Sequence, residues 1–261
     1  MIWDQLAYRQ IEKLDRNIPV LLTVAATEQH GPHLPLATDR LIGEHFAAAL
    51  NAALQDSILI LPSVGIGCSG HHMEFAGTLS LSHTTFAMVV KDIIGSVLQH
   101  GFYKIILFNS HGGNQGIGQV VLEQLGQENP EAHIVGVTWW LIAQESLREI
   151  TETGAGGTGH ACEFETSLME VIASDLVNKS QIQIGGNISG FAWAEGDMLK
   201  GPKASYYRTF RSMTSNGIFG DPTKATIEKG KRITDVVVNA LQRVATDLYA
   251  TKRNGNPDIR C

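Results

Sequence analysis

Two acidic residues and a histidine fall within one short segment that follows an apolar run. The segment TEQHGPHLPLATD (27–39) holds Glu28, His30 and Asp39. Glu28 and His30 are two positions apart, so on an extended chain both side chains leave the same face. Carboxylates and an imidazole that converge in this way suit a divalent metal ion. Taken singly, each residue has a simpler interpretation. Asp39 could be just a helix cap, Glu28 an exposed loop acid and His30 a histidine in a turn. The three together favour a metal site.

A fourth candidate ligand, His111, lies in the segment NSHGGNQ (109–115), again directly after an apolar run. Gly112 and Gly113 would let the backbone approach whatever His111 contacts, so both are candidate substrate-binding positions. The same glycines could instead cradle a phosphate group, which would make the protein a nucleotide binder. The run HGGNQGIG has neither the GxGxxG nor the P-loop order, so the metal-ligand interpretation is favoured.

A glycine-rich stretch (154–159) leads into His160, Glu163 and Glu165 at the expected start of a helix. Acid and base groups at a junction between loop and helix could move protons, so His160 and Glu165 are candidate catalytic residues. The alternative for the acids is a favourable position at the positive end of the helix dipole. Cys162 could act as a nucleophile, but its spacing from His160 indicates no activated thiol, and a buried structural role is favoured.

Other residues could form the walls of a substrate pocket. His72 lies in a loop punctuated by glycines, GIGCSGHHMEFAGTL (65–79). Trp139 and Trp140 follow a further apolar run, where an aromatic wall for a small planar substrate would stand. Packing in the core is the alternative for at least one of these tryptophans.

The elements that must position these residues can be predicted from periodicity. Apolar runs predict buried strands at 19–26, 57–61, 104–108 and 133–137. Helical spacing of apolar residues predicts helices at 39–54, 86–98, 114–125 and about 223–248. Strand alternating with helix predicts an α/β fold, with a mainly parallel sheet covered on both faces, in one domain over residues 1–261. Ligands bind such sheets at the carboxyl ends of the strands, where the motifs lie.

Two segments depart from this pattern. The stretch at about 184–221 is rich in glycine, serine and aromatic residues and is too long for an ordinary connection. We expect it to shape a pocket or a contact between subunits. The basic run at 229–232 is expected to be a solvated face of the last helix.

Composition excludes several classes of protein. Of the 261 residues, 43% are hydrophobic and 18% are charged, as in an ordinary globular chain. A net charge of −6 argues against a nucleic-acid-binding surface. Neither a membrane span nor a signal peptide is expected, because apolar runs are short and the first residues are charged. Three widely spaced cysteines indicate a reducing compartment, so a cytoplasmic location is expected.

The ordered motifs resemble those of the creatininase (creatinine amidohydrolase) family over most of the chain. The matching segments are EQHGPHLPLATD (28–39), GHHMEFAGTLSL (70–81), NSHGGN (109–114), HACEFETSLM (160–169) and GIFGDPTKAT (217–226). The resemblance implies a three-layer α/β/α fold with a binuclear metal centre, usually zinc with zinc, manganese or iron. It also implies a homo-oligomer, often a hexamer.

The resemblance further implies roles for individual residues. Glu28 and His111 would bind one metal ion, His30 would bind the other, and Asp39 would bridge the two. His160 matches a histidine that handles substrate or protons.

One departure from the family pattern follows His111. Creatininase has an aromatic residue and a glutamate where this chain has Gly112 and Gly113, and that glutamate completes its second metal site. A replacement ligand must come from elsewhere. We expect Glu163 in this role, with Glu165 as the next candidate.

The expected function is therefore hydrolysis of a non-peptide C–N amide bond in a small molecule, a cyclic amide or a formamide, by water activated between two metal ions. The missing aromatic residue weakens the case for creatinine itself. The alternatives are a peptide-trimming hydrolase of the same family and a catalytically silent protein that binds small molecules.

Overall fold

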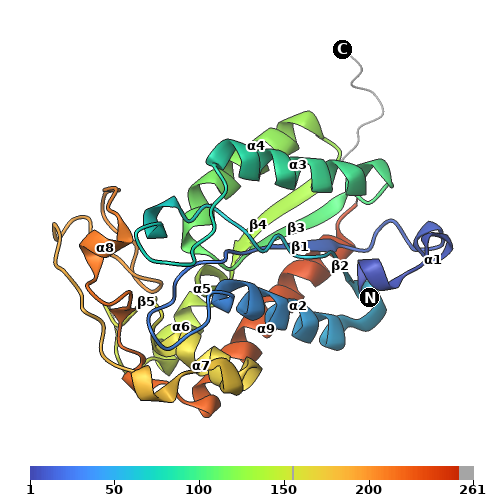
Figure 1. Cartoon of the computed structure of the whole chain (residues 1–261). Helices are drawn as coiled ribbons and strands as arrows, with labels where there is room; N and C mark the ends of the chain where they lie inside the picture. The colour runs from blue at the N-terminus through green and yellow to red at the C-terminus, as the bar shows by residue number, and fades with distance from the viewer. Residues whose placement is uncertain (155, 253–261) are drawn as a thin grey trace.

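A parallel sheet lies between two layers of helices in the computed structural model, which describes residues 1–154 and 156–252 (Figure 1). The four strands are β1 (Val20–Val24), β2 (Leu59–Ile60), β3 (Lys104–Asn109) and β4 (His133–Thr138). Their order in the sheet is β2-β1-β3-β4, and all neighbours run parallel. The expected three-layer α/β/α fold is confirmed, and each expected strand is present with ends that differ by a few residues.

Helices cover both faces of the sheet (Figure 1). The first layer holds α3 (His83–Gln99) and α4 (Gln115–Glu128). The second holds α2 (Thr38–Leu54), α7 (Glu163–Ile172) and α9 (Ile227–Ala250). Short helices complete the chain: α1 (Tyr8–Glu12), α5 (Trp139–Ile142), α6 (Gln144–Ile150) and α8 (Phe210–Met213). None of the helices in the described part of the chain is long and apolar enough to cross a membrane.

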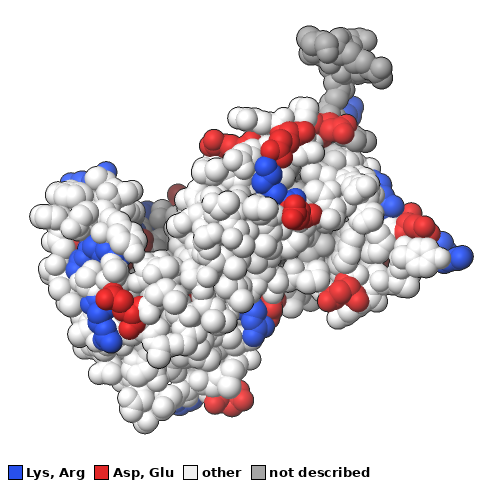
Figure 2. Space-filling view, turned by 45° about the horizontal axis from the view of Figure 1, so that its top comes forward, with Lys and Arg blue, Asp and Glu red and all other residues white. Residues whose placement is uncertain are grey.

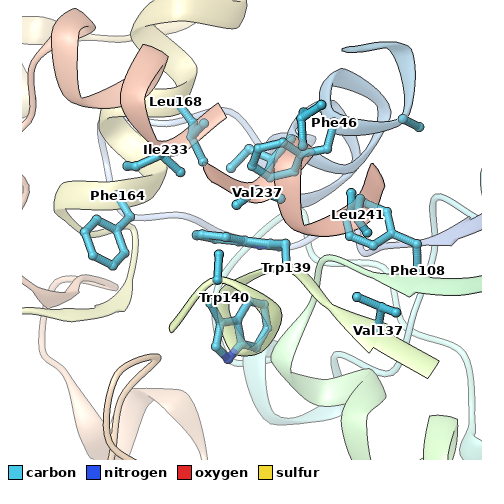
Figure 3. Close-up of a cluster of buried hydrophobic side chains, with 14 of the residues drawn as sticks. Phe46, Phe108, Val137, Trp139, Trp140, Phe164, Leu168, Ile233, Val237 and Leu241 are labelled. Atoms are coloured by element: carbon cyan, nitrogen blue, oxygen red, sulfur yellow. The ribbon is translucent and has the colours of Figure 1, made fainter. Parts of the chain in front are cut away.

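Each face of the sheet has its own apolar core. All five residues of β1 are buried, because its side chains alternate between the two helical layers. On the side of α2, α7 and α9, Trp139 lies at the centre of the core (Figure 3). Its ring centroid is 5.7 Å from that of Phe46 and 5.4 Å from that of Trp140. Trp139 has no exposed surface, so the prediction that it lines a substrate pocket is wrong.

The segment expected to be a functional excursion forms a lobe beside the sheet. It contains α8 and ends at β6 (Phe219–Gly220), which pairs antiparallel with β5 (Thr158–His160). The lobe projects from the body of the molecule, and Figure 2 shows a notch between the two. Several of its large apolar side chains are exposed, among them Phe191, Tyr206 and Tyr207.

Candidate metal centre

Six side chains from separate segments meet at the carboxyl end of the sheet, and all of them are buried. Glu28 and His30 follow β1, and His111 follows β3. Asp39 and Glu165 stand in the first turns of α2 and α7, and His160 ends β5. The structure therefore brings together at one rim the residues that the sequence placed after separate strands.

One group of possible ligands consists of Glu28, Asp39 and His111. Their nearest ligand atoms all lie within 4.8 Å of one another. Nδ1 of His111 is 3.3 Å from Oε1 of Glu28 and 3.1 Å from Oδ2 of Asp39. Two carboxylates and one imidazole around a single point form a donor set that suits zinc, manganese or iron.

A second group consists of His30, His160 and Glu165, with ligand atoms again within 4.8 Å of one another. Nε2 of His30 is 3.3 Å from Oδ1 of Asp39 and 3.8 Å from Oε1 of Glu165. Asp39 therefore directs one oxygen towards His111 and the other towards His30. This is the position that a bridging carboxylate needs.

Backbone carbonyl groups fix the orientation of three of these imidazole rings. Nδ1 of His30 lies 3.0 Å from the carbonyl oxygen of Glu28, and Nε2 of His160 lies 2.7 Å from that of Gln29. Nε2 of His111 lies 3.2 Å from the carbonyl oxygen of Cys68. A carbonyl oxygen can only accept, so each of these nitrogens carries a proton. The opposite nitrogen of each ring faces the carboxylates, as in histidines that bind metal ions.

The side chain of Gln29 has the opposite effect on His72. Gln29 Nε2 donates to Nδ1 of His72 over 3.0 Å, so the proton of His72 is on Nε2, 3.4 Å from Oε1 of Glu28. Burial, only partly offset by Glu28, lowers the pKa of His72 to about 3. His72 is therefore neutral and holds the Glu28 carboxylate in place. Its ring also lies on the wall of the pocket above the cluster, where a substrate-binding role was predicted.

The carboxylates of the cluster raise the pKa of His111 and of His30. Burial by itself lowers the pKa of His111, but Glu28 and Asp39 outweigh it and raise the pKa to about 10. His30 behaves in the same way, because Asp39 and Glu165 together raise its pKa well above the usual value despite burial. The pKa of Glu165 is raised, mainly by burial. A carboxylate in this position needs a cationic partner to stay ionised.

Unpaired atoms provide a test of whether divalent ions fit here. Oε2 of Glu28, Nε2 of His30 and Oδ2 of Asp39 are buried and make no hydrogen bond of acceptable geometry within the described residues. A buried polar atom without a partner is destabilising by about 1–3 kcal/mol. These three unpaired atoms are possible metal ligands, and they come from both groups. The residues present therefore fit two divalent ions that share Asp39.

Glu163 does not join the cluster, although the sequence favoured it as the replacement ligand. Its carboxylate accepts from Nζ of Lys229 at 2.6 Å, from the hydroxyls of Thr151 and Thr153, and from the backbone of Glu152. This binds the start of α7 to α9 and to the loop after α6. Lys229 is buried in this contact, so the prediction that the whole basic run is solvated is also wrong. Glu165 leaves α7 on the other side of the helix and faces His30.

The glycines after His111 have different roles. Gly112 lines the pocket, and a methyl group added there would meet no atom within 4 Å. At Gly113 an added Cβ would lie 2.2 Å from the carbonyl oxygen of Cys68 and 2.4 Å from Nε2 of His111. This close packing leaves no room for the glutamate that creatininase has at the corresponding position. Gly113 also lines the pocket, so it supports His111 from a position on the pocket wall.

We expect Gly113→Ala to displace His111 from the carbonyl of Cys68 and to weaken metal binding by about 10- to 100-fold, the usual effect of losing a supporting contact of a ligand. Gly112→Ala is the matched control, because its site is open. Zinc titration monitored by calorimetry measures both variants. Equal zinc affinities for the two would show that Gly113 has no such role.

The pocket over the cluster has a volume of about 190 Å³ and includes residues that the sequence did not single out. Trp140 lines it, as predicted. Phe210 from the lobe stacks on His72, with ring centroids 4.1 Å apart, and meets His160 edge-on at 4.6 Å. Asp197 and Met198 also come from the lobe. The aromatic content of the lobe was a signal for a pocket, but nothing in the pattern identified these positions.

Comparisons with known proteins agree with the fold. Residues 4–245 match the family model for creatininase, described as creatinine amidohydrolase. A mycofactocin precursor peptide peptidase from Mycobacterium tuberculosis is 30% identical over 236 residues, which cover 87% of this chain and 84% of the relative. A creatinine amidohydrolase from Pseudomonas putida is 28% identical over 177 residues, 62% of this chain and 67% of the relative. The crystal structure of a candidate creatinine amidohydrolase from Bacteroides fragilis has a TM-score of 0.81 at 27% identity, with 97% of each chain covered.

Proposed function

Because this chain belongs to the creatininase family of hydrolases that act on C–N bonds, we propose that it hydrolyses an amide bond with two divalent metal ions. One observation carries the proposal. Three buried imidazoles are turned by backbone carbonyls so that their second nitrogens face the carboxylates. A cluster without a metal role would gain nothing from this common orientation.

The proposed ligands are taken from the two groups, with Asp39 shared between the ions and His160 assigned to proton transfer instead. Glu28, Asp39 and His111 would hold one ion, and His30, Asp39 and Glu165 would hold the other. Zinc paired with zinc, manganese or iron suits this oxygen and nitrogen set. Creatininases of the same fold have been solved in a Zn–Zn form and a Mn form, which supports the choice of metals.

Two divalent ions, when bound, supply a water of lowered pKa and polarise the carbonyl group of an amide. The protein would supply proton transfer and orientation. His160 keeps its proton on Nε2, towards the carbonyl of Gln29, so its free Nδ1 faces the cluster and could take a proton from the attacking water and pass it to the leaving nitrogen. Burial and the nearby His30 and His72 hold the pKa of His160 well below its usual value, so a proton taken up at Nδ1 is readily given up again. Trp140 and Phe210 restrict water at the pocket wall.

The class of amide is the finer part of the proposal. The M. tuberculosis relative is named as a peptide peptidase, which supports a peptide amide as substrate. The P. putida relative is named as a creatinine amidohydrolase, which supports a small cyclic amide or a formamide as the second candidate.

A panel of substrates with defined metals tests the function. Protein loaded with zinc or manganese should hold about two ions per chain and hydrolyse at least one of creatinine, a formylaminopyrimidine, a hydantoin or short peptides. A chelator should remove the activity, and added metal should restore it. Purified protein that binds neither zinc nor manganese would instead be the silent binding protein considered from the sequence.

A further inference from the structure

A second cavity lies in the lobe, next to the pocket over the metal cluster. Its volume is about 300 Å³, at the lower end of the size range of ligand pockets. Phe191, Tyr206, Met213 and Phe219 supply apolar walls. The metal cluster does not use this cavity, and the larger of the two spaces is therefore without a role in the chemistry described above.

The two spaces share a wall. Asp197 lines both of them. On the paired strands β5 and β6, His160 lies opposite Phe219; the first lines the metal pocket and the second lines the lobe cavity. Gly159 completes this wall, because a Cβ there would lie 2.3 Å from the Phe219 ring. The two spaces are therefore adjacent, with Asp197 at their common boundary.

Asp197 is held as a fixed rim between the two spaces. One of its oxygens accepts from the backbone of Leu199 and Lys200 at 2.9 and 2.8 Å. The other accepts from the backbone of Gly156 and from the hydroxyl of Thr158. Because both oxygens of Asp197 already accept hydrogen bonds from the protein, the position of this side chain between the two spaces does not depend on a ligand.

The charged residues that line the cavity are balanced in sign. Glu195 accepts from the backbone of Gly190, and Arg208 donates to the carbonyl oxygens of Ile188 and Ser212. Two acidic and two basic residues line the space: Glu195, Asp197, Lys200 and Arg208. The aromatic rings of Phe191, Tyr206 and Phe219 are therefore the surface on which a ligand could pack.

Three aromatic rings of the lobe pack against one another in the absence of a ligand. Phe191 stacks on Trp193 with ring centroids 5.0 Å apart, and Tyr206 meets both rings edge-on. Phe191 and Tyr206 nevertheless keep 54% and 53% of their surface exposed. A preformed aromatic wall of this kind suits a large apolar side chain.

We propose that the lobe cavity is a substrate subsite that receives a large apolar side chain of a peptide whose scissile amide lies at the metal cluster. This inference rests on the proposed amide hydrolysis and narrows its substrate class to peptides that extend beyond the cleaved bond. A small cyclic amide or a formamide would fill the metal pocket and leave the lobe cavity unused.

A peptide mixture prepared from a digested proteome tests the subsite. The metal-loaded protein is incubated with the mixture, and the cleaved peptides are identified by mass spectrometry. We expect large apolar residues to be enriched by about tenfold at one fixed position away from the cleaved bond, the usual discrimination of an apolar pocket. Phe191→Ala and Tyr206→Ala should lose this enrichment while they keep their metal ions.

Tyr207→Ala is the matched control, since Tyr207 is 75% exposed and does not line the cavity. The subsite is overturned if Phe191→Ala and Tyr206→Ala keep the preference of the wild type. It is also overturned if peptides stay intact while the small-amide panel is hydrolysed, or if these two variants change only the oligomeric mass in light scattering. If the protein with two ions cleaves neither peptides nor small amides, the proposed function itself fails, and the subsite fails with it.

Discussion

Asp39→Ala should lose both metal ions and all hydrolytic activity while the protein stays folded. Asp39 directs one oxygen to each side of the cluster, 3.1 Å from Nδ1 of His111 and 3.3 Å from Nε2 of His30. Removing it should therefore take a proposed ligand from both ions at once. Metal analysis by mass spectrometry should fall from about two ions per chain to less than one. Circular dichroism checks that the fold survives.

Asp235→Ala is a suitable control, because Asp235 is exposed on α9, away from the cluster. Asp39→Asn keeps the size of the side chain and removes its charge, so it separates loss of a ligand from loss of packing. A fully active Asp39→Ala protein without metal would end the two-ion proposal.

Glu163→Gln and Glu165→Gln should have opposite effects, although the two residues are neighbours on the first turn of α7. Glu165→Gln removes a ligand proposed for the second ion, so activity should fall by at least about 100-fold. The metal-free fold should not suffer, because burial disfavours the ionised form of Glu165 and raises its pKa. Glu163→Gln should keep both ions and lose about 2 kcal/mol of unfolding free energy, because it removes one of the two carboxylates, Glu163 and Glu152, that lie 2.6 Å from Nζ of Lys229.

The effect of Glu163 should depend on pH with a definite sign. Burial alone raises the pKa of Glu163, but Lys229 and Thr153 outweigh it and bring the pKa below the usual 4.5. The ionised carboxylate therefore stabilises the fold above pH 4.5, and this contribution is lost as the pH falls through the lowered pKa. Urea unfolding of wild type and Glu163→Gln should show the full difference at neutral pH and a smaller one in acid. A difference that grows in acid would contradict this assignment.

The sheet and most of the cluster could be predicted because both follow from local patterns. Apolar runs identified the strands, and parallel strands end at the same edge. Glu28, His30 and His111 follow such strands directly, and Asp39 begins the next helix. That these four residues lie close together could therefore be predicted without knowing how distant helices pack.

The choice between neighbouring residues could not be predicted in the same way. Glu163 and Glu165 are two positions apart, so their side chains leave α7 about 200° from each other. The docking of α7 against α9 decides which one faces the cluster, and Lys229 holds Glu163 on the other side. Trp139 and Trp140 present the same problem, because both rings are buried in the core and only packing shows which one also reaches the pocket. The lobe lacks any regular period, so Phe210 gave no local sign that it would reach His72.

The atoms that face the centre of the cluster are oxygen and nitrogen, and sulfur is missing from every candidate ligand group in the described part of the chain. Cys68 and Cys162 are buried outside these groups, and burial raises the pKa of both thiols. Peroxide attacks thiolate ligands, so it finds no such target here. Ions held by carboxylates and imidazoles can be exchanged according to supply. A centre built in this way would offer peroxide no sulfur ligand to oxidise, and manganese could replace zinc when zinc is scarce.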